Sequence, residues 1–393
     1  MDCTGNVCVA KEINVRETMK IMLIRDRNVL NNNWLVYFAN LLTESGHEVI
    51  IACDTYSKFG KLAPNLALDE KVRIINLNAK TDSGIKNIYR KIRSKLIPAW
   101  FRFKKLINRE RPDVLVCYFP VDLLNVTRFQ NHHIPIVQMV HGRPCLVTKK
   151  LIKKLWYSKS CVRQIDTWQV LLESYKEDVD KRFAPKNIVS IANPVKQYSD
   201  DEIVDLSDEK KCIIYIARIE KDIKRPHLLV EAFEKVAKDF PKWRVEIWGM
   251  RKYPDYDKEI EDFITTHGLE NQVKLMGYAD NVEEIYRHAD MQAFPSKGEG
   301  FSLALADAMS LGLPEIGFKD AYSVNEVIKD GHNGYLVKDV DEFAKRLGEL
   351  MANKELRIRL GKNAHEDMKA YAPEKIIAKW NELFGALVPP PHA

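Results

Sequence analysis

The sequence predicts an α/β protein made of two doubly wound domains that face a central cleft. The chain has 393 residues, more than one hydrophobic core usually serves. Its composition, 46% apolar and 30% charged, is that of an ordinary globular protein. Short apolar runs alternate with segments of helical periodicity in two separate series. Such alternation is typical of parallel sheets covered on both faces.

The first series predicts an N-terminal domain at residues 19–195. Its first strand is the apolar run Lys20–Ile24, and its first helix has apolar spacing over Trp34–Glu44. The further strands share short apolar runs next to turn residues, and we expect them within Gly46–Ala52, Val72–Leu77, Val114–Tyr118 and Ile134–Val140. Residues 1–18 carry charges and no apolar segment, so we expect a flexible extension there and no signal peptide.

A polar, acidic stretch at 196–211 is the expected linker, and the second series predicts a C-terminal domain at 212–370. Its strands are expected at Ile213–Ile216, Arg244–Trp248, Val273–Met276 and Met291–Phe294, with helices at Leu228–Phe240, at Asp257–His267 and from Leu303. Residues 371–393 are expected to form a C-terminal helix, which could pack back on the N-terminal domain, and a tail. Ligands of doubly wound domains bind at the carboxyl ends of the strands.

Cysteine usage and hydropathy exclude several classes of protein. The seven cysteines are scattered, with no CxxC pair, so neither a disulfide framework nor a zinc ribbon is indicated. This favours a reducing, cytoplasmic compartment. No apolar run approaches the ~20 residues of a membrane span. We interpret the three Asp-x-Asp pairs, Asp178/Asp180, Asp255/Asp257 and Asp339/Asp341, as solvated acids and expect no metal site.

The net charge of +6 is unevenly distributed. From Lys80 to Arg111 there are eleven Lys or Arg residues and two acids, and between Arg143 and Arg163 there are seven bases and no acid. Aromatic and aliphatic residues recur at helical spacing in the first of these stretches. Such basic helices suit the anionic inner face of a membrane, where the protein would be peripheral. A solvated helix face is the alternative interpretation, and no recognisable nucleic-acid-binding module accompanies the charge.

The most informative segment runs from Phe294 to Met309. It begins as the end of an apolar strand, and Gly300 in the following loop allows a ligand to approach the backbone closely. Ser302 can cap a helix that begins near Leu303, and the free N–H groups of a helix N-terminus favour an anion such as phosphate.

Two acids flank this expected phosphate position. Glu299 lies in the loop, and Asp307 follows it by eight positions, inside the helix. Both can accept hydrogen bonds from hydroxyl groups, one from a sugar and the other from a ribose. The segment therefore predicts a site for a nucleotide-sugar.

Four segments in fixed order carry a family resemblance. They are Ile216–Glu220 with Lys224–Phe233, Val245–Gly249, Glu299–Asp307, and Glu326–Val337. Together they resemble the donor half of retaining glycosyltransferases of family 4, also called glycosyl transferases group 1. In that family an E-x7-E signature corresponds to the third segment, and here Asp307 replaces the second Glu. The N-terminal half resembles the family less. Two of its segments do fit: His141 after the strand Ile134–Val140, and the segment around Asn193.

The resemblance implies the GT-B fold, in which two Rossmann-like domains face each other, and it implies residue roles. Arg218 and Lys224 would neutralise the donor diphosphate, Glu299 would hold sugar hydroxyls, and His141 would contact the sugar or the acceptor. The donor-binding residues it implies are Gly249, Gly300, Phe301, Ser302, Leu303 and Asp307. It implies catalysis without a metal or cofactor.

The activity implied is transfer of a hexose-type sugar from a nucleotide-sugar, with a UDP-sugar favoured, to a glycan or lipid-linked acceptor in surface polysaccharide or lipopolysaccharide synthesis. The expected partners are thus the donor, a saccharide or lipid-linked acceptor and an anionic membrane surface. Two alternatives stay open from the sequence: a nucleotide-sugar epimerase of the same architecture and a non-catalytic subunit that binds nucleotide-sugars.

Overall fold

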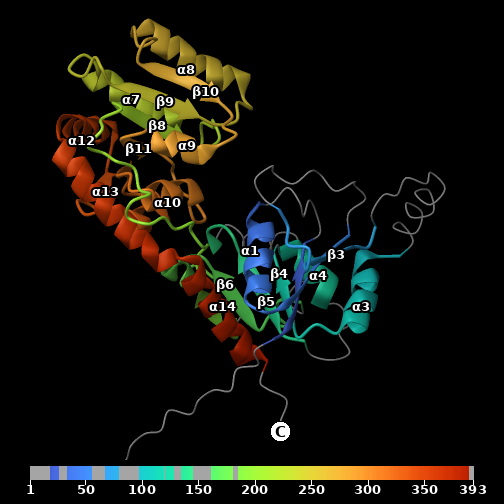
Figure 1. Cartoon of the computed structure of the whole chain (residues 1–393). Helices are drawn as coiled ribbons and strands as arrows, with labels where there is room; N and C mark the ends of the chain where they lie inside the picture. Colours follow the sequence, from blue (N-terminus) through green and yellow to red (C-terminus); the bar gives the residue numbers. More distant parts are fainter. Residues whose placement is uncertain are drawn as a thin grey trace, which may run out of the picture.

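The computed structural model shows two α/β lobes (Figure 1). It describes residues 18–25, 33–54, 67–78, 97–118, 120–127, 134–144, 161–179 and 185–388. Most of the expected extension, the C-terminal tail after residue 388, the bases between residues 80 and 95 and those at 149–159 lie outside these ranges.

The N-terminal lobe holds a seven-stranded parallel sheet in the order β3-β2-β1-β4-β5-β6-β7. Its strands are β1 (Lys20–Ile24), β2 (Glu48–Cys53), β3 (Arg73–Asn76), β4 (Val114–Cys117), β5 (Ile136–Val140), β6 (Thr167–Val170) and β7 (Ile188–Ser190). The helices are α1 (Asn33–Glu44), α3 (Ala99–Glu110), α4 (Pro120–Thr127) and the short 3-10 helix η2 (Glu173–Lys176). The order reverses between β1 and β4, which is where doubly wound sheets form their ligand crevice.

The C-terminal lobe holds a six-stranded parallel sheet in the order β10-β9-β8-β11-β12-β13. Its strands are β8 (Cys212–Ile216), β9 (Arg244–Trp248), β10 (Val273–Gly277), β11 (Met291–Phe294), β12 (Glu315–Phe318) and β13 (Gly334–Val337). Its helices are α7 (Pro226–Ala237), α8 (Pro254–Thr266), α9 (Val282–Arg287), α10 (Leu303–Ser310), α11 (Val324–Val327), α12 (Val340–Ala352) and α13 (Lys354–Met368). The order reverses between β8 and β11. The predicted α/β architecture of two doubly wound sheets is confirmed.

Helices cover both faces of the C-terminal sheet at β8, and this explains the apolar run of that strand. All five residues of β8 are buried. Alternate residues face two separate clusters: Ile213 packs with the cluster that includes α7, α8 and α12, and Ile214 packs with the cluster that includes α9 and α10. Proline at the first turn of α7 and of α8 suits the helix start, where a backbone N–H would lack a partner.

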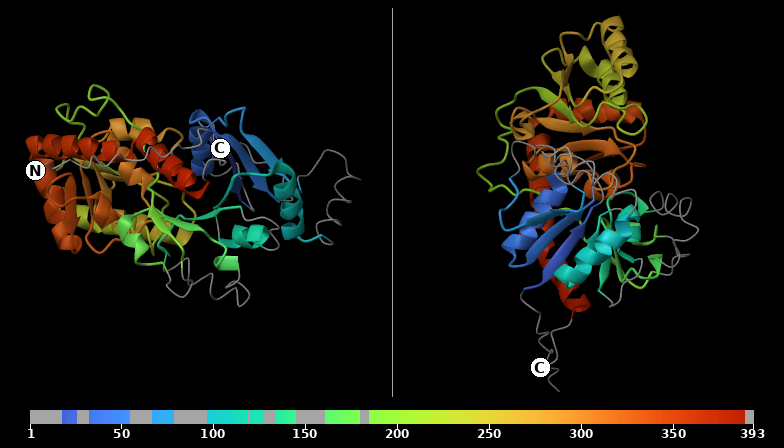
Figure 2. Two further views of the ribbon diagram at one scale, coloured as in Figure 1. Left: turned by 90° about the horizontal axis from the view of Figure 1, so that it is seen from below. Right: turned by 90° about the vertical axis from the view of Figure 1, so that its right-hand side faces the viewer.

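The last helix, α14 (Pro373–Leu387), returns to the N-terminal lobe after the short 3-10 helix η4 (Lys369–Tyr371). Its Trp380 ring lies 4.8 Å from the Phe38 ring of α1, and Trp380 and Phe384 are buried in the core formed with β1 and β2. Figure 1 shows α13 and α14 as a continuous diagonal edge that links the lobes, and the lobes remain distinct in both further views (Figure 2).

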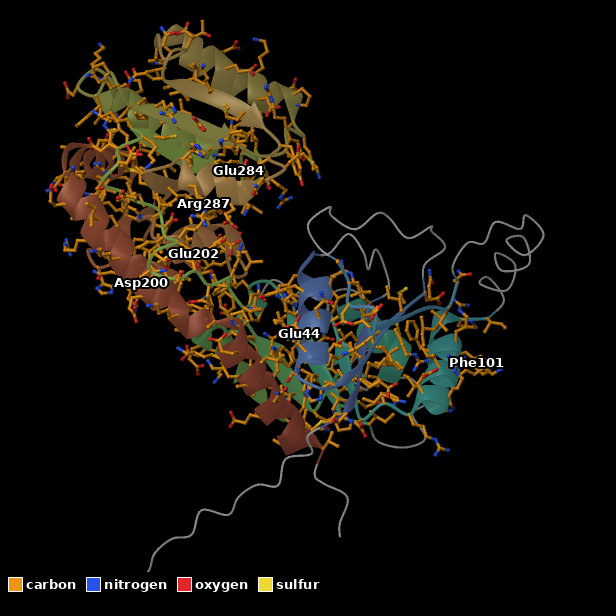
Figure 3. The ribbon with its side chains drawn as sticks, in the orientation of Figure 1. Glu44, Phe101, Asp200, Glu202, Glu284 and Arg287 are labelled. Carbon is orange, nitrogen blue, oxygen red and sulfur yellow. The ribbon has the colours of Figure 1, made fainter. Side chains whose placement is uncertain are left out.

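Two sequence interpretations need correction or restriction. Asp257 was expected to be solvated, but it is buried and pairs with Arg251 at 3.0 Å, because the first turn of α8 folds toward the loop after β9. In α3, Phe103 and Ile107 point into the core and Arg102 pairs with Asp54, so its apolar stripe is a packing face. Phe101 is exposed and projects from the outer side of α3 (Figure 3). Within the described ranges, no helix combines the length and apolarity needed to cross a bilayer.

A buried acid in β12 leads to the first prediction. Glu315 is fully buried, and among the described residues neither carboxyl oxygen has a hydrogen-bond partner. Burial raises its pKa well above the ordinary value, and neighbouring Gln292 opposes this only in part. The folded protein therefore keeps this carboxyl protonated to a higher pH than the unfolded chain does. As the pH rises above about 4.5, the unfolded chain loses the proton first, so the free energy of unfolding falls.

We expect Glu315→Val to raise the free energy of unfolding at pH 8 by about 1–3 kcal/mol, because it removes an unsatisfied buried polar group. Urea unfolding at pH 8 and pH 5 would measure this gain, which should shrink at pH 5, where the wild-type carboxyl is protonated in the folded state. A destabilised variant at both pH values would contradict the prediction.

Candidate active site

The predicted site residues follow the carboxyl ends of strands in both sheets. His141 comes directly after β5, Arg218 follows β8 by two residues, and Gly249 comes directly after β9. Glu299 lies in the loop between β11 and α10. The two lobes meet at this loop, because a Cβ added to Gly300 would lie 2.3 Å from the carbonyl oxygen of His141. The fold therefore brings His141 and the Glu299 loop together from opposite lobes.

Glu299 and Lys224 form an ion pair. The Lys224 Nζ lies 2.5 Å from the Glu299 Oε1, and the two side chains are only 12% and 13% exposed. Lys224 belongs to the loop between β8 and α7, which lies beside the Glu299 loop because Ile223 accepts a hydrogen bond from the Lys297 N–H at 2.7 Å. The site thus holds a cation and a carboxylate in contact, largely screened from water.

The two other cations near Lys224 have different surroundings. Lys221 forms an exposed pair with Glu259 of α8 at 2.6 Å. Arg225 donates to the Pro295 carbonyl at 3.0 Å and lies over the Phe318 ring. Of the three, Lys224 is the cation that contacts Glu299.

Arg218 is more exposed than Lys224. Its guanidinium lies 3.5 Å from Glu220, and 57% of its side chain is accessible. Its backbone is better held, because the buried Tyr215 hydroxyl donates to the Arg218 carbonyl at 3.0 Å. The structure therefore fixes the position of the Arg218 backbone after β8, while the charged end stays accessible to an anion.

The start of α10 matches the sequence prediction. The helix begins at Leu303, and the Ser302 hydroxyl caps it by accepting from the Leu305 N–H at 3.3 Å. Phe301 is buried against the ring of Tyr371, so it anchors the loop in the core. The first N–H groups of α10 thus follow the Glu299 loop directly, as a phosphate-binding helix start requires.

Asp307 lies in the second turn of α10. Burial raises its pKa to about 7, and Lys196 opposes the shift. Its charge also acts on the hydroxyl groups of Tyr37 in α1, Tyr198 and Tyr286. Because Tyr37 belongs to the N-terminal lobe, Asp307 lies near the region where the lobes meet.

This shift predicts a pH dependence. A carboxyl whose pKa is raised by folding favours the folded state most at low pH, and that contribution is lost between about pH 4 and pH 7. If the ionised carboxylate accepts from ribose hydroxyls, we expect the affinity for UDP to increase several-fold from pH 6 to pH 8. Calorimetric titration would measure this increase. In Asp307→Asn, the affinity for UDP should change less between pH 6 and pH 8 than in the wild type. The melting temperature of this variant should rise more at pH 8 than at pH 5. A pH profile of UDP affinity identical to that of the wild type would contradict the role of Asp307.

His141 lies in an aromatic cluster. Its ring stacks on Tyr118 at 4.3 Å and meets the Trp34 ring edge-on at 4.4 Å. Burial, together with the charge of Arg25, lowers its pKa to about 3, so the imidazole is neutral near pH 7. Its Nε2 atom is buried and has no hydrogen-bond partner among the described residues. A neutral imidazole of this kind can exchange hydrogen bonds with a hydroxyl group.

Three residues for which the sequence predicted no role in the site also contact the Glu299 loop or its neighbours. The Tyr175 hydroxyl donates to the Glu299 carbonyl at 2.7 Å. The Tyr322 carbonyl accepts from the Glu299 N–H at 3.1 Å, and Arg143 lies over the Tyr322 ring. Tyr175 follows β6, a strand with two polar residues that was not predicted, so no sequence signal indicated it.

No group of three or more His, Cys, Asp or Glu side chains in the described ranges could hold a metal ion. Residues 26–32, which connect β1 to α1 in the chain, lie outside those ranges.

Comparisons with known proteins show the family and the fold. Residues 197–367 match the family model of glycosyl transferases group 1, and residues 32–197 match that of glycosyltransferase family 4. An uncharacterized glycosyltransferase of Haemophilus influenzae is 24% identical over 348 residues, covering 88% of this chain and 93% of that protein. The poly(ribitol-phosphate) alpha-N-acetylglucosaminyltransferase of Staphylococcus aureus is 24% identical over 346 residues, covering 85% and 69% respectively.

A solved structure shares the fold. Staphylococcus aureus TarM, crystallised as a variant with fondaparinux, alpha-GlcNAc-glycerol and UDP, superposes with a TM-score of 0.73 at 17% identity, over 93% of this chain and all of that one. The fold is therefore GT-B, and the two family models together span both lobes. The chain belongs to the family 4, group 1 glycosyltransferases and is a transferase enzyme.

Proposed function

We propose that this enzyme transfers a hexose-type sugar from a UDP-sugar to a glycan or lipid-linked acceptor of a surface polymer, with retention of the anomeric configuration. The observation that carries the proposal is the shielded Lys224–Glu299 pair at the start of α10, opposite His141 of the other lobe. At this point a cation and a helix N-terminus can contact a diphosphate, and a carboxylate beside them can accept hydrogen bonds from sugar hydroxyls.

The proposed chemistry assigns a task to each group. Lys224, Arg218 and the first N–H groups of α10 stabilise the negative charge that grows on the departing diphosphate. The Glu299 carboxylate accepts from sugar hydroxyls and orients the anomeric carbon. The neutral imidazole of His141 contacts the sugar or the acceptor. The acceptor hydroxyl attacks on the face from which the nucleotide leaves, through an oxocarbenium-like state, without a dedicated protein nucleophile. The bond between the anomeric carbon and the diphosphate oxygen breaks, the glycosidic bond forms, and the departing diphosphate takes the proton of the acceptor hydroxyl.

The relatives support the donor and acceptor classes. The Staphylococcus aureus relative is named for transfer of N-acetylglucosamine to poly(ribitol-phosphate), and TarM was crystallised with UDP. A polyol-phosphate chain is a hydroxyl-bearing polymer, which agrees with a polymeric acceptor. We therefore favour UDP-sugars as donors and a polymer or lipid-linked glycan as acceptor.

A donor titration and a product assay test the proposal. We expect UDP to bind in calorimetry and a screen of UDP-glucose, UDP-galactose and UDP-N-acetylglucosamine to yield a glycoside with the donor's anomeric configuration by NMR. Conversion of the donor without an acceptor would favour an epimerase instead. Binding without turnover on any acceptor in a polyol-phosphate and lipid-linked panel would favour a sugar-nucleotide-binding subunit. An inverted product would contradict retention.

We also propose that basic helices dock the enzyme on the anionic inner face of a membrane. In the described part of the basic stretch, α3 presents exposed Phe101 with Lys105 above its ring at 5.5 Å, on the outer side of the lobe. An aromatic ring beside a cation suits the interface of an anionic bilayer. Sedimentation with anionic liposomes at low and high salt measures this binding, which should weaken at high salt. Equal binding to neutral vesicles would contradict the electrostatic part of the proposal.

A further inference from the structure

The backbone of Glu299 is held from the N-terminal lobe as well as from its own lobe. From its own lobe, the Tyr322 carbonyl accepts the Glu299 N–H at 3.1 Å. From the other lobe, the Tyr175 hydroxyl donates to the Glu299 carbonyl at 2.7 Å, although the two residues are 124 positions apart in sequence. The peptide groups on both sides of the Glu299 Cα therefore have fixed partners, and one partner belongs to the opposite lobe.

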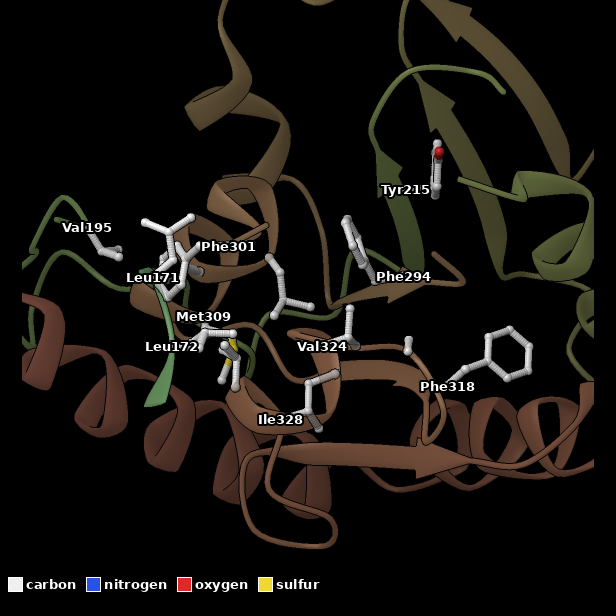
Figure 4. Close-up of a cluster of buried hydrophobic side chains, with 14 of the residues drawn as sticks. Leu171, Leu172, Val195, Tyr215, Phe294, Phe301, Met309, Phe318, Val324 and Ile328 are labelled. Carbon is white, nitrogen blue, oxygen red and sulfur yellow. The ribbon is translucent and has the colours of Figure 1, made fainter. Parts of the chain in front are cut away.

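Apolar packing holds the same segment of the N-terminal lobe against the loop. Leu171 and Leu172, which follow β6, share a buried cluster with Phe301 and Met309. In the close-up, Leu171 lies beside Phe301 and Leu172 beside Met309 (Figure 4). The hydroxyl of Tyr175 thus extends from a packed segment, residues 171–176, which we call the β6 extension.

Two further contacts join the same surfaces. The Ser174 hydroxyl of the β6 extension donates to the Glu326 carboxylate of α11. Arg143, two residues after His141, pairs with Asp178 at 2.6 Å and lies 5.1 Å from the centre of the Tyr322 ring. The ring of Tyr322 packs directly against Gly298, because a Cβ there would lie 2.1 Å from the ring. The loop from Gly298 to Phe301 is therefore confined between Tyr322 and the N-terminal lobe.

We propose that Tyr175 is a positioning residue, which sets the Glu299 carboxylate for transfer by holding the Glu299 peptide from the acceptor lobe. The proposal rests on the function proposed above and assigns separate steps of it to the two lobes. The diphosphate contacts, Lys224, Arg218 and α10, all belong to the C-terminal lobe, so nucleotide binding needs that lobe alone. Alignment of Glu299 needs the β6 extension, so the transfer step needs both lobes in contact.

The variant Tyr175→Phe tests this with little disturbance of the core. The Tyr175 ring is buried in the apolar cluster and remains so in the variant, while the hydrogen bond to the Glu299 carbonyl is lost. Tyr256→Phe is the matched control. Its hydroxyl also makes a hydrogen bond, to the His227 ring at 2.6 Å, but that bond joins α8 to α7 within the C-terminal lobe.

The kinetic experiment uses the full chain, with UDP as binding probe and the UDP-sugar that the wild type turns over as substrate. For Tyr175→Phe we expect kcat to fall about 10-fold or more, while the Kd for UDP stays within about 2-fold of wild type. Tyr256→Phe should change neither value. An unchanged kcat in Tyr175→Phe, or a loss of UDP affinity equal to the loss of kcat, would overturn the positioning role.

A second measurement does not depend on turnover. Hydrogen–deuterium exchange of the full chain should show faster exchange in peptides covering residues 298–302 in Tyr175→Phe, and wild-type exchange there in Tyr256→Phe. Unchanged exchange in Tyr175→Phe would refute the inference even if transfer were found. If Tyr175→Phe exchanged faster but the wild type bound no UDP, the contact between the lobes would be supported, whereas the proposed function would be contradicted.

Discussion

Glu299→Ala should lower turnover at least about 10²-fold while the protein stays folded. The carboxylate is 13% exposed and touches Lys224, so its contacts are made away from water, where charge-assisted hydrogen bonds contribute most. Loss of one such contact from an active site costs roughly 2–4 kcal/mol. Arg218→Ala should show a loss of the same order, because it removes a cation proposed to neutralise the leaving diphosphate. Transfer from a UDP-sugar under saturating donor measures both effects.

A matched control separates the site from a general loss of ion pairs. Glu259 also pairs with a lysine, Lys221, at 2.6 Å, but both side chains are more than half exposed on the surface of the C-terminal lobe. Exposed pairs contribute little to stability, so Glu259→Ala should keep turnover within about 2-fold of wild type. Near-normal turnover in both Glu299→Ala and Arg218→Ala, with folding confirmed by circular dichroism, would refute the assignment.

Gly249→Ala should strongly destabilise the C-terminal lobe, although it adds only one methyl group. A Cβ at this position would lie 1.8 Å from the carbonyl oxygen of Ala217 and 2.9 Å from its carbonyl carbon. Both of these Ala217 atoms belong to the backbone. Hydrogen bonds hold the two residues at the ends of their strands: the Ala217 N–H donates to the Trp248 carbonyl, and the Gly249 N–H donates to the Gly277 carbonyl. The strand ends of β8 and β9 must therefore separate, and we expect a loss of about 3 kcal/mol in the free energy of unfolding.

Urea unfolding measures this loss, and UDP titration should show weaker binding, since the displaced turn follows the strands that carry the site. Gly348→Ala is the control. This glycine lies within α12, where an added Cβ would meet side chains at 3.8 Å, an ordinary contact. Alanine is favoured over glycine in helices by roughly 1 kcal/mol, so the control should be neutral or stabilised. Equal stability of both variants would mean that the Ala217 contact relaxes without cost.

The strands that the sequence predicted best are those with apolar residues on both faces. β1 from Ile21 onward and β8 throughout are buried runs, as expected for strands covered on both sides. β6 was missed because Gln169 lies within it, buried, and its amide donates to the backbone carbonyls of Val170 and Ile191. β12 was missed because it begins with the buried Glu315. Polar residues inside a sheet break the hydrophobic pattern, and only their tertiary surroundings explain them.

The candidate site divides in the same way. The cap at Ser302 and the start of α10 are local features, so spacing along the chain was enough to predict them. Spacing alone does not separate Lys224 from Lys221 and Arg225, which lie within five positions. The family resemblance indicated Lys224, and the structure shows that Lys224 contacts Glu299. The contact of Tyr175 with Glu299 joins segments from two lobes, and no periodicity in a single sequence reports such a pairing.

The return of α14 affects how the chain can mature on the ribosome. Trp380 and Phe384 fill the core beside α1 and β2, so the first lobe to be synthesised lacks part of its interior until α14 emerges. A nascent lobe in that state leaves the apolar surface around Phe38 open to solvent or to chaperones. Completion of the amino-terminal lobe is thus coupled to the synthesis of α14, which follows the C-terminal sheet in the chain.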